Sequence, residues 1–198
     1  LNEPVYNPSF PGINISEQVN GVFTNFQYLT YAIDQFGSSY ELIVEDPDCS
    51  AGQACRIVEI NWSDFGIQSL PELFGHNIYG IKKLQSLNLS YNHIQEIPES
   101  ISSLNDLVYL NLNHNSIYSL PEDISNCPLT YLDLSYNDIS QLPSDFGSLL
   151  NLNYLDLSRN NIEEFNYSNF SSLITLYLEG NKISEFPEIM CENNINKY

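Results

Sequence analysis

Leucine and isoleucine recur at fixed distances along most of this chain. The unit is a leucine, a second leucine three residues later, a third two residues after that, and an asparagine three residues further on, as in Leu84, Leu87, Leu89 and Asn92. Five units of this kind begin at Leu84, Leu107, Leu129, Leu152 and Leu173. A degenerate sixth unit precedes them, built on Ile57, Ile60 and Trp62, with Phe65 in the place of the asparagine.

The alternation within each unit predicts a short strand with one buried face. One unit is too small to bury its own apolar residues, so we expect the units to stack into a solenoid with a parallel sheet and a continuous core. The repeated asparagine suits a buried turn, where its amide can bond to the backbone of the neighbouring coil. A proline follows most units, as in Ile97-Pro98 and Leu120-Pro121, and we expect it to begin the return side.

These residues resemble the leucine-rich repeat family over about residues 56–190, and the leucine-proline endings are similar to its plant-like and eukaryotic extracellular subclasses. The resemblance implies an α/β fold, a right-handed solenoid with a short parallel β-sheet on the concave side. It also implies an irregular or 3-10 helical convex side and a helical N-terminal cap. About six units would then fill residues 57–190.

The two ends of the chain depart from the repeat. Residues 22–37 have apolar side chains at helical spacing. By resemblance to secreted leucine-rich repeat proteins, residues 1–56 form an N-terminal cap with a disulfide between Cys49 and Cys55. A metal site at this cysteine pair is the weaker interpretation. Residues 191–198 form a C-terminal tail without a visible cap, which indicates either further chain or a partner at that end.

The other two cysteines have different predicted states. Cys127 fills a position that holds Leu104 and Leu149 in neighbouring units, so we expect a buried free thiol. Cys191 lies three repeats further along, roughly 15 Å away at strand spacing, which is too far for a bond within the chain. We therefore expect Cys191 to pair outside this chain, and an intermolecular disulfide is one candidate.

The charge narrows the range of partners. There are 25 acidic against 6 basic residues, a formal net charge of -19. Such a surface repels phosphate, which argues against nucleic acid and anionic membranes and leaves basic partners and Ca²⁺ open. No apolar run is long enough to span a bilayer, so no membrane insertion is expected within this chain.

Several outward positions of the predicted sheet carry tyrosine or aspartate. Tyrosine offers a large contact area with a polar tip, which suits recognition, although the same rings could simply stack and stabilise the sheet. We predict a partner-binding surface at this face. Its residues are Tyr109, Tyr131, Asp133, Tyr136, Tyr154, Asp156 and Arg159.

The chain also carries five usable acceptor triplets for N-linked glycan. They begin at Asn14, Asn61, Asn88, Asn166 and Asn169. Asn88 has a second explanation, because Asp133 and Asp156 occupy its place in later units and are also followed by Leu-Ser. Asn166 and Asn169 fall where the fourth unit lacks its proline, which indicates a solvated loop.

No catalytic residues, metal site or cofactor are predicted. His93 and His114 lie on different parts of consecutive repeats, with no nucleophile placed beside them. Asp133 and Asp156 lie on a flat sheet rather than in a pocket, and no calcium-loop motif or phosphate-binding loop is present.

The sequence therefore favours a non-enzymatic, extracellular glycoprotein, secreted or on the cell surface, that binds a protein or glycoprotein ligand through the concave face. The alternative is a structural subunit of an extracellular filament or matrix, assembled from copies of itself by end-to-end stacking. The uncapped C-terminus, Cys191 and the acceptor triplets favour that alternative.

Overall fold

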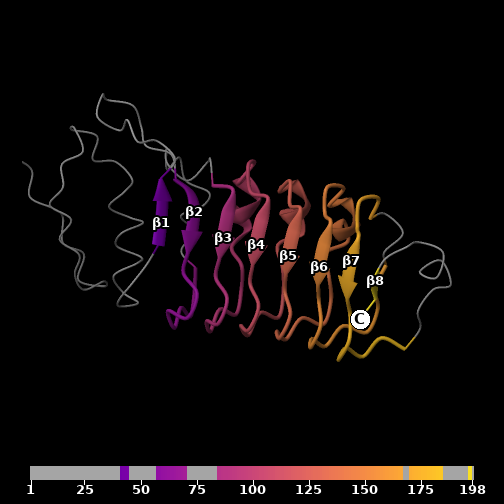
Figure 1. Ribbon diagram of the computed structural model, residues 1–198. Coiled ribbons are helices and arrows are strands. Elements are labelled where there is room, and N and C mark those ends of the chain that lie inside the picture. The colour runs from indigo at the N-terminus through magenta and orange to yellow at the C-terminus, as the bar shows by residue number, and fades with distance from the viewer. Residues whose placement is uncertain (1–40, 45–56, 71–83, 167–169, 185–195, 198) are drawn as a thin grey trace, which may run out of the picture.

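The computed structural model describes residues 41–44, 57–70, 84–166, 170–184 and 196–197. These residues form a solenoid in which one strand from each coil lies beside the strand of the next (Figure 1). The predicted cap helix and the Cys49–Cys55 pair lie outside the described residues.

The sheet has eight strands in chain order. The strands are β1 Glu41–Val44, β2 Ile57–Asn61, β3 Ser86–Asn88, β4 Tyr109–Asn111, β5 Tyr131–Asp133, β6 Tyr154–Asp156, β7 Thr175–Tyr177 and β8 Asn196–Lys197. β1 pairs with β2 in the antiparallel sense, and every later pair is parallel. The predicted parallel sheet of one strand per repeat is therefore confirmed.

The register is the same at every repeat, because each strand is formed by the same three positions of the unit. Leu87 pairs with Leu110, Leu110 with Leu132 and Leu132 with Leu155. These central leucines are at most 1% exposed, while the residues on either side of them point away from the core. The other leucines and isoleucines of the units complete one continuous core.

The buried asparagines join each coil to the one before it. Asn137 donates from its amide nitrogen to Leu112 O and Leu134 O, both at 3.0 Å, and its Oδ1 accepts from Ile117 N–H at 2.9 Å. Asn92, Asn115, Asn160 and Asn181 repeat this arrangement. The predicted role of the repeated asparagine is thus confirmed.

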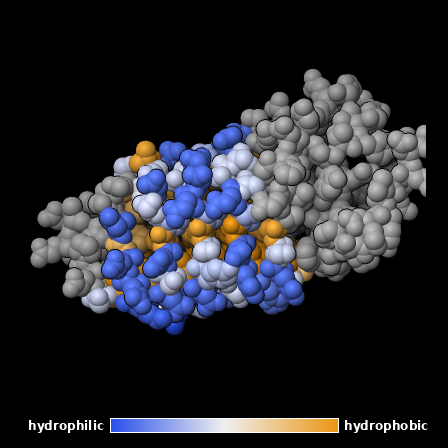
Figure 2. Space-filling model, turned by 180° about the vertical axis from the view of Figure 1, so that it is seen from behind, coloured by the Kyte–Doolittle hydropathy of each residue, from blue (hydrophilic) through white to orange (hydrophobic). Residues whose placement is uncertain are grey.

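The return side of the coils carries three 3-10 helices, and no α-helix occurs in the described part of the chain. They are η4 Glu99–Ser103, η5 Glu122–Asn126 and η6 Phe146–Ser148. Pro98 and Pro121 immediately precede η4 and η5, as their fixed φ and missing N–H favour. Viewed from behind, the molecule shows an apolar band that runs lengthwise between polar margins (Figure 2).

Candidate partner-binding face

Three rows of side chains run along the sheet face that points away from the core, here called the open sheet face. The tyrosine row is Glu59, Ser86, Tyr109, Tyr131, Tyr154 and Thr175. The amide–carboxylate row is Asn61, Asn88, Asn111, Asp133, Asp156 and Tyr177. The rim row, three residues after the second, is Asp64, Tyr91, His114, Tyr136, Arg159 and Gly180.

The rings of the tyrosine row are stacked. Tyr109 and Tyr131 have centroids 4.4 Å apart and planes 12° apart, and Tyr131 and Tyr154 are also 4.4 Å apart, at 8°. In-register parallel strands place equivalent residues one strand spacing apart, which is close to the distance between the centroids of two stacked rings. The inner ring, Tyr131, therefore has both faces covered and presents its edge and hydroxyl.

The rim row makes a second aromatic stack. His114 lies 4.2 Å from Tyr91 and 4.2 Å from Tyr136, with planes 14° and 16° apart. All three have a positive φ, an uncommon backbone state for residues other than glycine. Backbone hydrogen bonds to the next coil stabilise this backbone state. His114 N donates to Ser135 O at 3.0 Å, and Tyr136 N donates to Ser158 O at 2.9 Å.

The rim row ends at Gly180, which has a φ of 73°. A Cβ on Gly180 would lie 2.8 Å from Cδ of Arg159, so the arginine side chain lies directly against this glycine. Arg159 itself is exposed and has a φ of 56°. The rim row thus changes from aromatic to basic towards the C-terminal end of the face.

Each member of the amide–carboxylate row that is Asn or Asp makes the same local turn. Its Oδ1 accepts from the backbone N–H two residues later, at 3.1 Å for Asn88 and for Asn111, and at 2.9 Å for Asp156. This is the Asx turn that both residue types favour. The recurring Asn-or-Asp choice at this position therefore has a structural cause.

Asp133 and Asp156 are neighbours in this row but differ in their surroundings. Asp133 is 6% exposed and accepts from Ser135 N at 3.0 Å, Ser135 Oγ at 2.7 Å and Asn113 Nδ2 at 2.8 Å. Both carboxylate oxygens of Asp133 therefore accept hydrogen bonds. Burial raises the pKa of Asp156, hydrogen bonds from Ser158 lower it, and the charges of Asp133 and Glu179 raise it further.

The tyrosine hydroxyls beside these carboxylates stay neutral well above physiological pH. Burial raises the pKa of Tyr154 to about 12, with further contributions from the charges of Asp156 and Asp133. Burial, and after it the charge of Asp133, also raises the pKa of Tyr131. The open sheet face therefore combines neutral hydroxyl groups with carboxylates.

The sequence-predicted contact residues do come together on this face. Tyr109, Tyr131 and Tyr154 share one row, Asp133 and Asp156 the next, and Tyr136 and Arg159 the rim. The prediction left out Tyr91 and His114, which occupy the same unit position as Tyr136 and could have been found from it. It also left out Tyr177, whose ring lies 5.8 Å from that of Tyr154 at a tilt of 54°.

The predicted glycan acceptors fall in different places. Asn61 and Asn88 are register partners on the open sheet face and are half-buried, while Asn166 is exposed on the return side. Asn88 belongs to the Asx-turn series described above, and the serine of its triplet, Ser90, is 5% exposed. Asn14 and Asn169 lie outside the described residues.

The one cysteine in the described residues is Cys127, which is free and 2% exposed. Its Sγ lies 3.3 Å from Ile101 O, and burial raises the pKa of the thiol to about 12. The predicted buried free thiol is thus confirmed, and its raised pKa disfavours the reactive thiolate. Cys191 and its predicted intermolecular bond lie outside the described residues.

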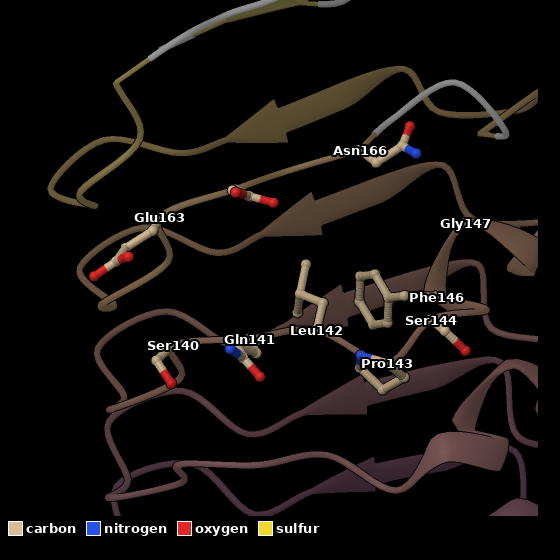
Figure 3. Close-up of a pocket in the computed structure, with 10 residues that line it drawn as sticks. Ser140, Gln141, Leu142, Pro143, Ser144, Phe146, Gly147, Glu163 and Asn166 are labelled. Carbon is tan, nitrogen blue, oxygen red and sulfur yellow. The ribbon is translucent and has the colours of Figure 1, made fainter.

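A hollow of about 550 Å³ lies on the return side, beside the fourth repeat (Figure 3). Leu142 and Phe146 line it from the third coil, and Glu163 and Asn166 line it from the fourth. The fourth unit is the shortest, because Leu152 and Leu173 are closer in sequence than any other pair of starting leucines. It also has Asn166 after Phe165 where most units have a proline.

The described residues bring no three His, Cys, Asp or Glu side chains into a metal-binding group. Across the described ranges, no helix has the length and apolar character needed to cross a membrane. The exposed groups that converge are those of the open sheet face, which can donate and accept hydrogen bonds and bear charge.

Comparisons with known proteins agree with this architecture. The leucine-rich repeat family profile matches residues 68–117 and 127–183, which is more than half of the chain. No curated protein matches the chain.

Among solved structures, a leucine-rich repeat protein of Leptospira interrogans is 31% identical, with a TM-score of 0.59 over 66% of this chain and 33% of that one. The ectodomain of the receptor kinase GASSHO1/SCHENGEN3 of Arabidopsis thaliana, solved with CASPARIAN STRIP INTEGRITY FACTOR 2, is 32% identical with a TM-score of 0.56. That match covers 63% of this chain and 16% of the receptor ectodomain. The present chain thus spans a third or less of either protein.

The complex of BIR3 with SERK2 from Arabidopsis thaliana contains a chain that is 27% identical, with a TM-score of 0.56 over 71% of this chain and 73% of that one. Leucine-rich repeats of this kind are typically protein-interaction folds without catalysis, and two of these three neighbours were solved with a protein partner. The repeat profile, the register of the strands and these neighbours together show that this chain belongs to the leucine-rich repeat family.

Proposed function

We propose that this chain is a non-enzymatic interaction module that binds a protein or glycoprotein through its open sheet face. The observation that carries the proposal is the convergence of two stacked aromatic rows on a row of amides and carboxylates. Tyr91 and Tyr136 are 54% and 48% exposed, so their rings are accessible to a partner.

The proposal extends to the setting of the chain. We place it outside the cell, secreted or on the cell surface, with glycan at some of the predicted acceptors and with residues 1–56 as a cap closed by Cys49–Cys55. Support comes from the acceptor triplets and from the similar structures, several of which are receptor ectodomains. Residues 57–190 would then carry the partner-binding face, and residues 191–198 would follow it as a tail.

Photo-cross-linking tests the binding face directly. Tyr131, at the centre of the tyrosine row, is replaced by p-benzoylphenylalanine, and a matched variant carries the same group at Tyr118, which is 47% exposed and outside the three rows. Each protein is irradiated with the extracellular fraction of its source cells, and products are identified by mass spectrometry.

We expect the Tyr131 probe to capture a different protein that the Tyr118 probe does not. Capture of the same proteins by both probes would contradict a specific face. Capture only of further copies of this chain would instead favour the filament subunit that the sequence left as the alternative.

A further inference from the structure

The ring stack of the rim row ends at Tyr136, on the side that faces the C-terminal coils. Tyr91, His114 and Tyr136 follow one another at centroid distances of 4.2 Å, so each coil of the solenoid adds one ring to the stack. The next rim position holds Arg159, and in the described part of the chain His114 is the only ring that contacts Tyr136. The face of Tyr136 towards Arg159 therefore carries no stacked ring, and the residue is 48% exposed.

Gly180 explains why the side chain of Arg159 leans away from this ring. Cδ of Arg159 lies 2.8 Å, and its Nε 3.3 Å, from the place that a Cβ on Gly180 would occupy. The arginine side chain thus lies over the following coil, in space that is available because glycine has no side chain. A fourth ring that continued the spacing of the stack would lie between the face of Tyr136 and the guanidinium of Arg159.

The guanidinium of Arg159 is available to a partner. Arg159 is exposed, and it is the one lysine or arginine in the three described rows. Within the ranges that the structure describes it forms no ion pair, although the chain carries 25 acidic residues. Its side chain is placed by packing against Gly180 rather than by a carboxylate. A guanidinium in this state can stack on a flat group that enters beside it.

The two walls of this space select the kind of group that fills it. The ring of Tyr136 pairs well with another aromatic ring, and the guanidinium of Arg159 is attracted to the negative face of such a ring. An aromatic side chain has two faces of this kind and interacts with both walls at once. A sugar ring has no π face for the guanidinium, and a lysine or arginine side chain would meet a like charge at Arg159.

We propose that the space between Tyr136 and Arg159 receives an aromatic side chain of the protein partner, which extends the rim stack by one ring. The inference rests on the proposed function, because it names a contact that the partner makes at the open sheet face. Tyr136 and Arg159 supply the two walls, and Gly180 allows Arg159 to stand apart from Tyr136. Tryptophan, tyrosine and arginine are the residue types that most often dominate the binding energy of protein interfaces.

Short peptides test the proposal on the full chain without knowledge of the natural partner. The probe is the tripeptide Gly-Trp-Gly, blocked at both ends, and Gly-Leu-Gly and N-acetylglucosamine are titrated in parallel. The signal is the Nε–Hε resonance of Arg159 in a proton–nitrogen correlation spectrum of the isotope-labelled protein. The chain has one other arginine, Arg56, and Arg159→Lys identifies the signal of Arg159 by its loss.

Tyr136→Asn removes one wall of the proposed space, and Tyr91→Asn is the matched control. The two tyrosines occupy the same unit position, both have a positive φ, and each stacks on one side of His114. Asparagine tolerates this backbone state, so each variant loses one stacked ring in the same way. Gly180→Asn is a second test, because its Cβ would displace Arg159 while asparagine still tolerates a φ of 73°.

We expect the tryptophan peptide to shift the Hε signal of Arg159 upfield, as a ring face placed against a proton does, and the leucine peptide to leave it in place. Tyr136→Asn and Gly180→Asn should each weaken this binding about fivefold or more, and Tyr91→Asn less than about twofold. The absence of a shift with the tryptophan peptide, or a larger one with N-acetylglucosamine, would overturn the proposal. Equal weakening by Tyr91→Asn and Tyr136→Asn would overturn it as well, because binding would then depend on the whole stack.

The two proposals fail separately. If the cross-linking probe at Tyr131 captures a partner but the tryptophan peptide does not shift Arg159, the binding face stands and the aromatic contact is wrong. If the peptide binds beside Arg159 while the Tyr131 probe captures no other protein, the aromatic contact is present and the proposed function fails. The backbone signals in the same spectra show whether each variant is folded.

Discussion

Asn137 shows what one buried side chain contributes to the stacking of coils. It donates to carbonyls of two coils and accepts from Ile117 N–H, so its removal leaves several buried backbone groups without partners. Each group left unsatisfied costs about 1–3 kcal/mol, and we expect Asn137→Ala to lower the free energy of unfolding by roughly 2–4 kcal/mol in urea denaturation. Asn153→Ala, at an exposed asparagine, should stay within about 0.5 kcal/mol. Equal losses would show that the buried amide has no special role.

The raised pKa of Asp156 has a consequence for stability. The folded state holds this proton more tightly than the unfolded state, so the contribution of the protonated carboxyl is complete at low pH and is lost as pH rises through the folded pKa. At neutral pH the wild-type chain therefore bears a penalty that Asp156→Asn avoids. We expect the variant to melt at a higher temperature than the wild type at pH 7, with the difference shrinking towards pH 4. A lower melting temperature at pH 7 would contradict the assignment.

Asp133→Asn should have the opposite effect at pH 7. Its carboxylate accepts from Asn113 Nδ2 and twice from Ser135, and an amide nitrogen in place of one oxygen would meet the donor of Asn113. Hydrogen bonds to a charged acceptor contribute about 1.5–3 kcal/mol, so we expect a loss of about 1 kcal/mol or more in urea denaturation. If both aspartates responded alike to substitution, the difference in their hydrogen bonding would have no energetic meaning.

At the residue scale, the sequence was sufficient to predict the surroundings of a side chain wherever its position recurs in every unit. The buried leucines, the turn asparagines and Cys127 could be placed because each has equivalents one unit away in similar surroundings. The difference in hydrogen bonding between Asp133 and Asp156 could not be predicted, because it depends on which side chain the preceding coil places beside each carboxylate. Asn113 and Ser135 occupy the same unit position, and only their placed side chains show which aspartate gains a donor.

On the open sheet face, neighbouring strands contact one another through the stacked rings of the tyrosine row. Tyr131 makes two stacks, and an aromatic pair contributes about 0.5–1.5 kcal/mol, so Tyr131→Ala should cost roughly 1–3 kcal/mol in urea denaturation. Tyr131→Phe retains both stacks and should cost less than about 1 kcal/mol. Tyr118→Ala, at an exposed ring outside the stacks, is the control and should be nearly neutral. A similar loss for Tyr131→Phe and Tyr131→Ala would assign the stability to the hydroxyl instead.

At the element scale, period-two alternation predicted the strands, and the prolines predicted where the return path begins. The rim stack was harder to foresee, because nothing in the pattern of hydrophobic residues marks a positive φ. Gly180 and Asp64 at the same unit position were the available signals, since both residue types tolerate this backbone state. The hollow lies beside the shortest unit, and the spacing of Leu152 and Leu173 already identifies that unit in the sequence.

For the whole molecule, the dominant electrostatic fact is the net charge of -19. Like charges on a compact chain repel one another, and added salt screens this repulsion. We expect the melting temperature to rise as NaCl is increased from low to physiological concentration. Equimolar sucrose, which carries no charge, should raise it less over the same range. A melting temperature that falls with NaCl would indicate that attractive ion pairs dominate instead.

The most direct test of the binding face is the identity of the segment cross-linked by the probe at Tyr131. Peptide sequencing by mass spectrometry would locate the attachment site in the captured protein. We predict a segment of a different protein, which the matched probe at Tyr118 does not capture. A segment of this chain itself, or the same segment from both probes, would contradict recognition of a different protein by the open sheet face.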